Sequence, residues 1–327
     1  MSSSVFNYNL TGPPLPPDHL LYHSHPRYYS PAPSLFPPLS DSILTVLSPL
    51  PAYWITAFFF FLLDSSNLPW IVRMRINESS EVTARNRASR LEVLRSVLFM
   101  QFLQTALGLF WVADIPRKTD HAAEMRGIAH RLMSPLGVFD DAAAPLAYMV
   151  YWWFVPAVQL LTAMVVLDSW QYVVHRTLHS IPFLYKHFHS VHHRLYVPYA
   201  YGTLYTHPVE GFVLDSVGAM IANTVTGLSL RQSMLFFVLT TCKAVDDHCG
   251  YRLPFDPLQF LSGNTAEYHD IHHQAIGIKY NFSQPWFIHW DVILGTRITT
   301  KGLEERRVKL KAARSAHGRG RGALYPV

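Results

Sequence analysis

The chain has 327 residues, of which half are hydrophobic and only 15% are charged, against about 25% charged residues in a typical soluble protein. This shortage of charge excludes an ordinary soluble domain and indicates a protein that contacts lipid. The formal net charge is +5, but the basic residues gather in one loop and in the C-terminal tail rather than in a patterned stripe. We therefore exclude nucleic acid as a partner and predict membrane lipid instead.

Residues 1–40 are rich in proline and serine and lack a basic start followed by an apolar core. This composition argues against a cleavable signal peptide. It also offers too little apolar surface for folding. We predict a disordered leader over residues 1–40.

Three apolar segments follow, each close to the roughly 20 residues that a helix needs to cross a bilayer. They are Ile43–Leu63, Val93–Ala113 and Ala142–Leu167. Pro49 and Pro51 interrupt the first segment, and Pro156 predicts an irregularity in the third. We assign residues 41–167 to transmembrane helices.

The second segment carries Gln101 and Gln104, which predict packing against neighbouring helices rather than against lipid alone. A fourth apolar region, residues 212–244, is broken around Gly227–Arg231. This break predicts a membrane hairpin of two shorter helices. The expected fold class is an all-α integral membrane protein with about four transmembrane or hairpin helices.

The basic residues predict the orientation in the membrane. The loop after the first segment is rich in arginine, at Arg73, Arg75, Arg85, Arg87 and Arg90. Such loops remain on the cytosolic side. Two further crossings return the chain to the cytosol before residue 168, so residues 168–300 are expected to face the cytosol. The basic tail, residues 301–327, is predicted to be disordered near anionic lipid.

Three histidine clusters lie between residues 168 and 300. They are His175 with His179, His189 with His192 and His193, and His269 with His272 and His273. Spacings of three and four place side chains on one face of a helix. Neutral imidazole is the commonest ligand for zinc and iron. The clusters offer more ligands than one tetrahedral ion uses, which favours two metal ions in a helical domain over residues 168–300.

Other residues near the clusters leave alternatives open. His207 and His248 could each complete a coordination sphere, although a lone histidine is more often structural. His187 points away from His189 on a helix and is not expected to be a ligand. Four aspartates could accept a hydrogen bond from a second ring nitrogen, and surface exposure explains each of them equally well; they are Asp168, Asp246, Asp247 and Asp270.

The clusters resemble those of the fatty acid hydroxylase and sterol desaturase superfamily. The resemblance continues through Asn281-Phe-Ser-Gln-Pro-Trp-Phe and Trp290-Asp291-x-x-x-Gly295-Thr296. Within the superfamily, His207-Pro-Val-Glu-Gly211 and Glu267-Tyr-His-Asp-Ile-His-His-Gln274 are similar to the sphinganine C4-hydroxylases.

This resemblance implies an O2-dependent di-iron monooxygenase of the endoplasmic reticulum membrane. It implies conversion of sphinganine, as the free base or in ceramide, to the 4-hydroxy form. Electrons would come from NADPH or NADH through a reductase and cytochrome b5, and Lys186, Arg194 and Lys279 could dock that acidic donor. The implied iron ligands are His175, His179, His189, His192, His193, His207, His248, His269, His272 and His273.

Two features leave the ligand set and the metal open. Some members of the resembled group have a further histidine where this chain has Ala244, so His207 is the least certain ligand of the ten. Histidine also suits zinc as well as iron.

The same superfamily contains alternatives: a sterol methyl oxidase, a sterol desaturase or an aldehyde-forming hydrocarbon enzyme. A non-catalytic membrane metal-binding scaffold is an alternative of another class. A transporter is disfavoured because the histidines lie outside the longest apolar segments.

Overall fold

The computed structural model of the protein describes residues 19–77, 84–111, 119–133, 143–260 and 262–318. In these ranges it contains helices and loops and no strand, which confirms the predicted all-α class. The chain divides into two units. The smaller comprises Met1–Leu35 and Asp114–Gln159, and the larger comprises Phe36–Ala113 and Leu160–Val327.

The smaller unit packs around one tryptophan. Its helices are η1 (Leu20–His23), α6 (His121–Met133), α7 (Ala143–Met149) and the π-helical turn η3 (Val150–Phe154). Trp152 is only 6% exposed and shares a core cluster with Tyr22 and Met125, rather than anchoring a membrane interface. The rings of His25 and Tyr29 also pack against it. Tyr22, His25 and Tyr29 of the predicted disordered leader therefore pack here, because their rings find an apolar partner. Residues 1–18 of that leader lie outside the described residues.

The irregularity predicted at Pro156 is present as the turn η3, directly before α8 (Val155–Ser180). Proline lacks the N–H that would bond the carbonyl four residues earlier. That carbonyl belongs to Trp152, and the Tyr28 hydroxyl donates a hydrogen bond to it instead. A side chain from the N-terminal segment thus satisfies the acceptor that proline leaves open.

Three helical stretches of the described chain are long and apolar enough to cross a membrane. They are Asp41–Asp64, Arg90–Trp111 and Ala143–Ser180, and each contains most of a predicted segment. Their outer faces carry exposed apolar side chains, as expected for contact with lipid. Examples are Ile55, Phe102, Phe110 and Leu161, with exposed fractions of 70%, 71%, 90% and 55%.

Pro49 and Gln101 act in these helices as predicted, whereas α2 continues through Pro51. The first stretch consists of α1 (Asp41–Leu47) and α2 (Pro49–Asp64), and α2 begins at Pro49, where a missing N–H costs nothing. The second stretch is α5 (Arg90–Trp111). Its Gln101 is 7% exposed and accepts a hydrogen bond from Trp54 Nε1 at 3.0 Å, which confirms that this glutamine packs on a neighbouring helix.

The fourth apolar region is broken where the sequence predicts. It contains α10 (Pro208–Gly211), the π-helical turn η7 (Phe212–Val217), α11 (Gly218–Thr226) and α12 (Leu230–Asp247). Helix α11 ends at Gly227, which has a left-handed φ of 62°, a conformation that glycine adopts without steric cost. A capping box at Ser229 starts α12. Helix α12 ends in charged residues and is not among the described helices that qualify as membrane spans.

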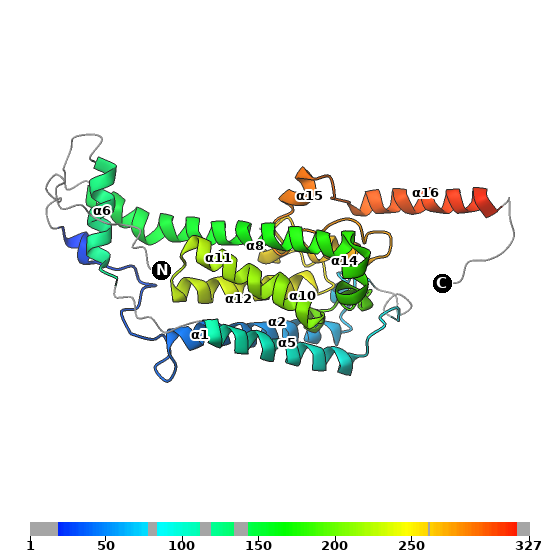
Figure 1. Cartoon of the computed structure of the whole chain (residues 1–327), viewed down its shortest axis with the longest axis horizontal. Helices are drawn as coiled ribbons and strands as arrows, with labels where there is room; N and C mark the ends of the chain where they lie inside the picture. Colours follow the sequence, from blue (N-terminus) through cyan, green and yellow to red (C-terminus); the bar gives the residue numbers. More distant parts are fainter. Residues whose placement is uncertain (1–18, 78–83, 112–118, 134–142, 261, 319–327) are drawn as a thin grey trace. The chain divides into compact units, whose positions relative to one another are not determined.

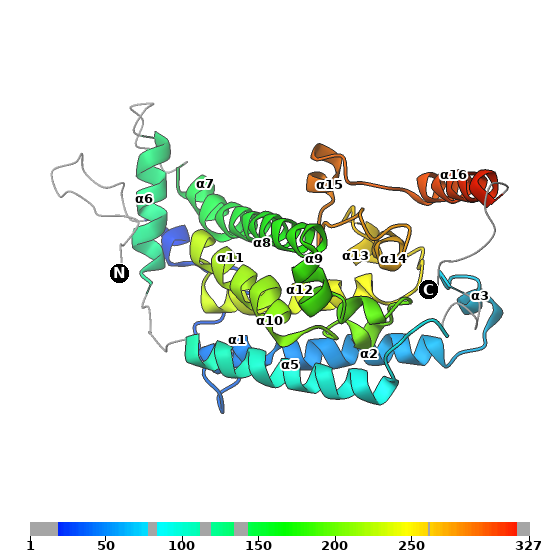
Figure 2. The ribbon, with the colours of Figure 1, turned by 45° about the vertical axis from the view of Figure 1, so that its right-hand side comes forward.

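In the larger unit the helices form layers. Helices α1, α2 and α5 lie side by side in one layer, and α11 and α12 lie between that layer and α8 (Figures 1 and 2). Ala163 and Leu167 of α8 pack against Ala222 and Phe236 in one core cluster. A second cluster joins α2 and α5 to the loops that follow the second histidine cluster, for example through Tyr53, Val97 and Leu195. The membrane helices therefore share their core with the histidine-bearing segments.

Short elements and one long helix complete the larger unit. They are α3 (Pro69–Val72), α9 (Pro182–Leu184), η4 (Tyr185–His189), η5 (His192–Arg194), η6 (Ala200–Gly202), α13 (Pro257–Phe260), α14 (Ala266–His273), α15 (His289–Ile293) and α16 (Thr300–Gly318). The long helix α16 corrects the predicted disorder of the basic tail up to Gly318. Its Leu303 is buried against Ile271 and Ile298, and that apolar contact explains the order.

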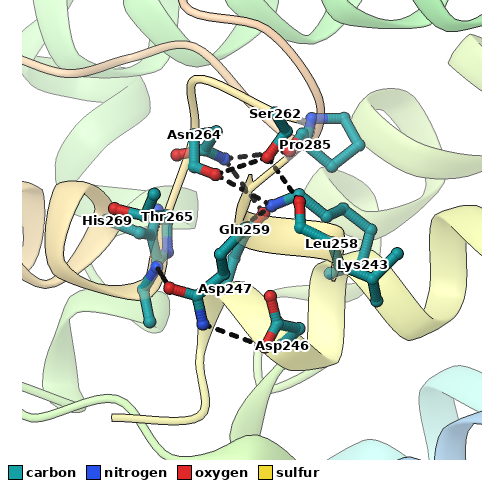
Figure 3. Close-up of polar contacts among 12 residues, drawn as sticks. Lys243, Asp246, Asp247, Leu258, Gln259, Ser262, Asn264, Thr265, His269 and Pro285 are labelled. Atoms are coloured by element: carbon teal, nitrogen blue, oxygen red, sulfur yellow. Dashed lines mark hydrogen bonds and ion pairs between the residues drawn. The ribbon is translucent and has the colours of Figure 1, made fainter. Parts of the chain in front are cut away.

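A buried ion pair within α12 is hydrogen-bonded to Asn264 in the loop before α14 (Figure 3). Lys243 is fully buried and its Nζ donates to a carboxylate oxygen of Asp247. Lys243 Nζ also donates to the Asn264 carbonyl at 3.2 Å, and Asn264 Nδ2 donates to Asp247 at 2.9 Å. This network fixes the chain immediately before Ala266, where α14 begins.

We expect Lys243→Met to lower the free energy of unfolding by about 3–5 kcal/mol, because it leaves the Asp247 carboxylate buried without a cation. The double variant Lys243→Met/Asp247→Asn removes both charges and should recover most of that loss. The melting temperature of the detergent-solubilised protein measures both effects. A double variant as unstable as the single one would contradict the role given to the ion pair.

Candidate metal centre

Nine buried or half-buried histidines gather into two groups. Within each group the ring nitrogens that could serve as ligands all lie within 4.8 Å of one another. The first group is His175, His179, His189, His193 and His272. The second group is His192, His248, His269 and His273. All three predicted clusters contribute, so residues nearly a hundred positions apart in the chain meet at adjacent points.

The local helices explain how the clusters reach these points. Helix α8 is 26 residues long, or about 39 Å at 1.5 Å per residue, which exceeds the roughly 30 Å hydrocarbon core of a bilayer. Its last turns carry His175 and His179. The π-helical turn η4 ends at His189, and α14 carries all three histidines of the last cluster.

The ring nitrogens converge closely. In the first group, His189 Nε2 lies 3.1 Å from both His175 Nε2 and His193 Nε2. In the second group, His269 Nε2 lies 3.1 Å from His248 Nε2 and 3.0 Å from His273 Nε2. Several lone pairs thus face one small volume, as the ligands of a metal ion do.

Backbone carbonyls set the orientation of most rings. Nδ1 of His175 lies 2.8 Å from the Phe282 carbonyl, and Nδ1 of His272 lies 2.7 Å from the Tyr280 carbonyl. The same contact joins His273 to Leu195 at 2.8 Å, His192 to Tyr205 at 3.2 Å and His248 to Ala244 at 2.8 Å. A carbonyl only accepts, so each Nδ1 carries the proton and each Nε2 keeps its lone pair.

One ring has a carboxylate partner. Nδ1 of His189 lies 2.6 Å from Glu210 Oε1, and both side chains are buried. A carboxylate on the far nitrogen makes the imidazole a more basic ligand. The sequence analysis missed this role of Glu210. An acidic residue at the start of the apolar region 212–244 was the signal for it, since such residues are rarely buried without a function.

The segments that begin at Asn281 and Trp290, which carry part of the family resemblance, hold the Phe282 carbonyl in place. Asp291 is fully buried and accepts hydrogen bonds from the backbone N–H groups of Phe282 and Ser283 at 3.1 and 2.7 Å. Asn281 is also fully buried, and its side chain bonds the backbone of Tyr268 and Ile298. These contacts fix the turn that presents the Phe282 carbonyl to His175.

The four aspartates considered as ring partners have other roles in the described structure. Asp168 accepts from the backbone N–H groups of Trp286 and Phe287. Asp246 binds Gln259, and Asp247 binds Lys243. Asp270 accepts from Asn77 and Gln274. Neither alternative left open for these aspartates holds: all four are buried, and carbonyl groups and Glu210 contact the rings instead.

Two of the remaining histidines lie outside both groups. His207 caps α10, where its Nδ1 accepts from the Val209 N–H at 3.2 Å, and its ring packs on Phe188. His187 is exposed and contacts the Phe183 carbonyl, as expected of a residue that points away from His189. Of the ten predicted ligands, the structure brings nine together and leaves His207 apart.

Burial keeps the converging rings neutral. It lowers the pKa of His189 and His248 to about 3 and that of His192 to about 4. His272 Nε2 is buried and has no hydrogen-bond partner among the described residues. Neutral rings with inward lone pairs and an unsatisfied nitrogen fit a metal centre, since a metal ion would supply the missing partner.

A cavity of about 540 Å³ ends at these histidines. Its walls come from α1, α2, α5, α8, η7, α11 and α12, and most of its lining is apolar. The lining includes His175 and His189 of the first group and His192, His248 and His269 of the second. A long apolar molecule could therefore reach both groups from the membrane helices.

Comparisons with known proteins agree with this geometry. A sequence profile described as fatty acid hydroxylase matches residues 160–296. The chain is 43% identical to a sphingolipid C4-hydroxylase of Saccharomyces cerevisiae over 85% of this chain and 78% of that protein. It is 40% identical to sphinganine C4-monooxygenase 1 of Arabidopsis thaliana, over 79% of this chain and 88% of that protein.

A relative named for another activity has the same identity to this chain as the Arabidopsis protein. The chain is 40% identical to a very-long-chain aldehyde decarbonylase of Oryza sativa over 80% of this chain and 90% of that protein. No solved structure matches the chain.

We expect His248→Ala to remove about half of the bound metal, because it takes one of four ligands from the second group. His207→Ala should keep the wild-type metal content and cost about 1 kcal/mol of stability through the lost helix cap. Metal per protein, measured by mass spectrometry of the purified variants, checks both expectations. Loss of metal from His207→Ala with normal folding would restore His207 as a ligand.

Acid should release the metal. The folded protein disfavours protonation of these rings, so the unfolded chain binds more protons between about pH 6.5 and pH 3. The stability that the neutral rings contribute is complete above about pH 6.5 and is lost as the pH falls toward the lowered pKa values of 3 to 4. Metal content after equilibration at pH 7.5, 6, 5 and 4 follows this loss. Constant metal content down to pH 4 would contradict it.

Proposed function

The chain belongs to the fatty acid hydroxylase family, and from this premise we propose that it is a membrane monooxygenase that hydroxylates C4 of sphinganine. The observation that carries the proposal is the apolar cavity that ends on both histidine groups. The relatives named as sphingolipid and sphinganine C4-hydroxylases support the choice of substrate and carbon atom.

The nine histidines of the two groups are proposed as the ligands of two iron ions. A pair of iron ions, when bound, supplies the two-electron activation of O2 that breaking an aliphatic C–H bond requires. The overall reaction balances as R–H + O2 + 2 electrons + 2 protons giving R–OH + H2O. All-histidine ligation, with Glu210 beside His189, distinguishes this site from the carboxylate-rich centres of soluble bundles.

The protein's own residues position the reactants. The carbonyls of Phe282, Tyr280 and Leu195 hold their rings in one orientation, so the ligand geometry exists before substrate binds. The cavity walls exclude water from the alkyl chain, for example at Leu107, Phe236 and Phe237. A substrate that slides from the bilayer into this cavity would lie with one end at the histidines.

The electron supply and location are part of the proposal. Electrons are proposed to come from NADPH or NADH through a reductase and cytochrome b5. The basic side chains Lys186 and Lys279 are exposed near the second and third clusters and would attract an acidic donor. Arg194, also considered for this role, already pairs with Glu92 at 2.6 Å. We place the protein in the endoplasmic reticulum membrane, with the histidine groups on the cytosolic side.

The test is expression in a yeast strain that lacks its own sphingolipid C4-hydroxylase, followed by mass spectrometry of the sphingoid bases. We expect 4-hydroxysphinganine from the wild type and from His187→Ala, which removes an exposed histidine outside both groups. His248→Ala should give less than roughly 1% of that product at equal protein level, because loss of an outer partner alone costs up to about 100-fold.

Other products would decide against the proposal. Oxidised 4-methyl sterols without 4-hydroxysphinganine would indicate a sterol methyl oxidase, and alkanes from long-chain aldehydes would indicate a decarbonylase. The absence of every product, with normal protein level and bound metal, would favour a non-catalytic scaffold.

A further inference from the structure

One acidic side chain in the cavity wall takes no part in holding the histidines. Three carboxylates line the cavity. Glu210 contacts His189, and Asp247 pairs with Lys243. Asp215, on the π-helical turn η7, accepts a hydrogen bond from Gln171 Nε2 at 3.1 Å, and Gln104 also hydrogen-bonds it. The acid Glu210 lies near enough to raise the pKa of Asp215. No lysine or arginine is among the described residues that line the cavity.

The Asp215 carboxylate has hydrogen bonds from amide groups and a second acid, Glu210, near it, but no compensating positive charge. Removal of a carboxylate from water is costly unless a cation joins it. Asp215 is partly accessible, and as a lining residue it faces the cavity. The arrangement therefore favours a cationic group on the molecule that fills the cavity.

Two further buried oxygens belong to a neighbouring pair of side chains, since Thr206 hydrogen-bonds Glu210. They are Thr206 Oγ1 and Glu210 Oε2, on side chains that are 7% and 4% exposed. Both residues line the same cavity. A hydroxyl and a carboxylate oxygen keep further lone pairs when they bond each other, so a ligand that carries hydroxyl or amine groups could join them.

The carboxylate lies close to the metal centre along two separate elements. Gln171, which holds Asp215, is four residues before His175 on α8, or about one turn of 5.4 Å. Asp215 itself is five residues after Glu210, whose other oxygen contacts His189. A group bound at Asp215 would thus lie beside two elements, α8 and the segment of Glu210, that also reach the first histidine group.

We infer that Asp215, positioned by Gln171 and Gln104, binds the protonated amine of a free sphingoid base. This inference rests on the proposed function. In a 2-amino-1,3-diol with an alkyl chain, only C2 and C3 separate the amine nitrogen from C4. An amine at Asp215 would hold C4 beside the histidine groups. The hydroxyl groups would meet Thr206 and Glu210, and the alkyl chain would follow the apolar wall along Val46, Leu107 and Phe237.

The charge selects the free base over its N-acyl form. An amide nitrogen is neutral, so an N-acylated substrate would leave the Asp215 carboxylate without a cation. A hydrogen bond between charged partners is stronger than one to a neutral donor by a margin worth about 10–100-fold in affinity.

The experiment compares sphinganine with N-acetylsphinganine, which has almost the same shape but no positive charge. For the full-length, metal-loaded protein, we expect Asp215→Asn to lower the ratio of kcat/KM for the amine over the amide by about 10–100-fold. Asp215→Glu should retain the preference for the amine. Glu304→Gln removes an exposed carboxylate of α16 and serves as the matched control.

Binding without reductant gives a readout that does not depend on turnover. The Kd of radiolabelled sphinganine should rise by a similar factor in Asp215→Asn, while the Kd of N-acetylsphinganine should change by less than about twofold. A merely structural role of Asp215 would weaken both ligands together and would overturn the inference. So would a wild-type enzyme that prefers the amide.

The two proposals fail in different ways. One outcome is that the wild type makes 4-hydroxysphinganine while Asp215→Asn keeps the wild-type ratios of kcat/KM and of Kd for the amine over the amide. The inference is then wrong and the proposed function stands. If the wild type hydroxylates neither compound, the proposed function is wrong. In that case the binding ratios alone decide whether Asp215 recognises an amine.

Discussion

The structure depends on one constraint. Nine imidazole rings must remain neutral, and each must point the lone pair of one ring nitrogen toward the centre of its group. Burial disfavours the protonated form, and in six of the rings an acceptor on the far nitrogen fixes the tautomer. The acceptors come from distant parts of the chain, as in the pairs His175 with Phe282 and His273 with Leu195. The same hydrogen bonds that orient the ligands therefore join the histidine-bearing segments to one another.

This constraint connects the metal centre to the membrane helices. Helix α8 is long enough to cross the hydrocarbon core and still present His175 and His179 at its end. It runs without interruption through the predicted boundary between residues 167 and 168. The apolar cavity between the membrane helices consequently opens onto the ligands, and substrate can remain among apolar side chains as it reaches them.

The charged side chains around the apolar cavity either pair with another group or contact a functional residue. Lys243 and Asp247 neutralise each other and fix the loop before α14. Glu210 acts on His189. Asp215 has hydrogen bonds from amides and no cation beside it among the described residues, which is why we infer a ligand role for this acid. Two π-helical turns, η4 and η7, carry His189 and Asp215, in keeping with the frequent use of such turns at functional sites.

The sequence alone determined the helical class, the three apolar stretches, the break at Gly227 and nine histidines that could share metal, because periodicity and composition act locally. It did not determine which histidines form each group, nor that His207 caps a helix while Glu210 orients a ring. It left the four aspartates open as ring partners, and it predicts disorder where α16 forms. Only the tertiary structure decided these points, since a ring partner or a covering apolar contact such as Leu303 on Ile271 is supplied by residues remote in the chain.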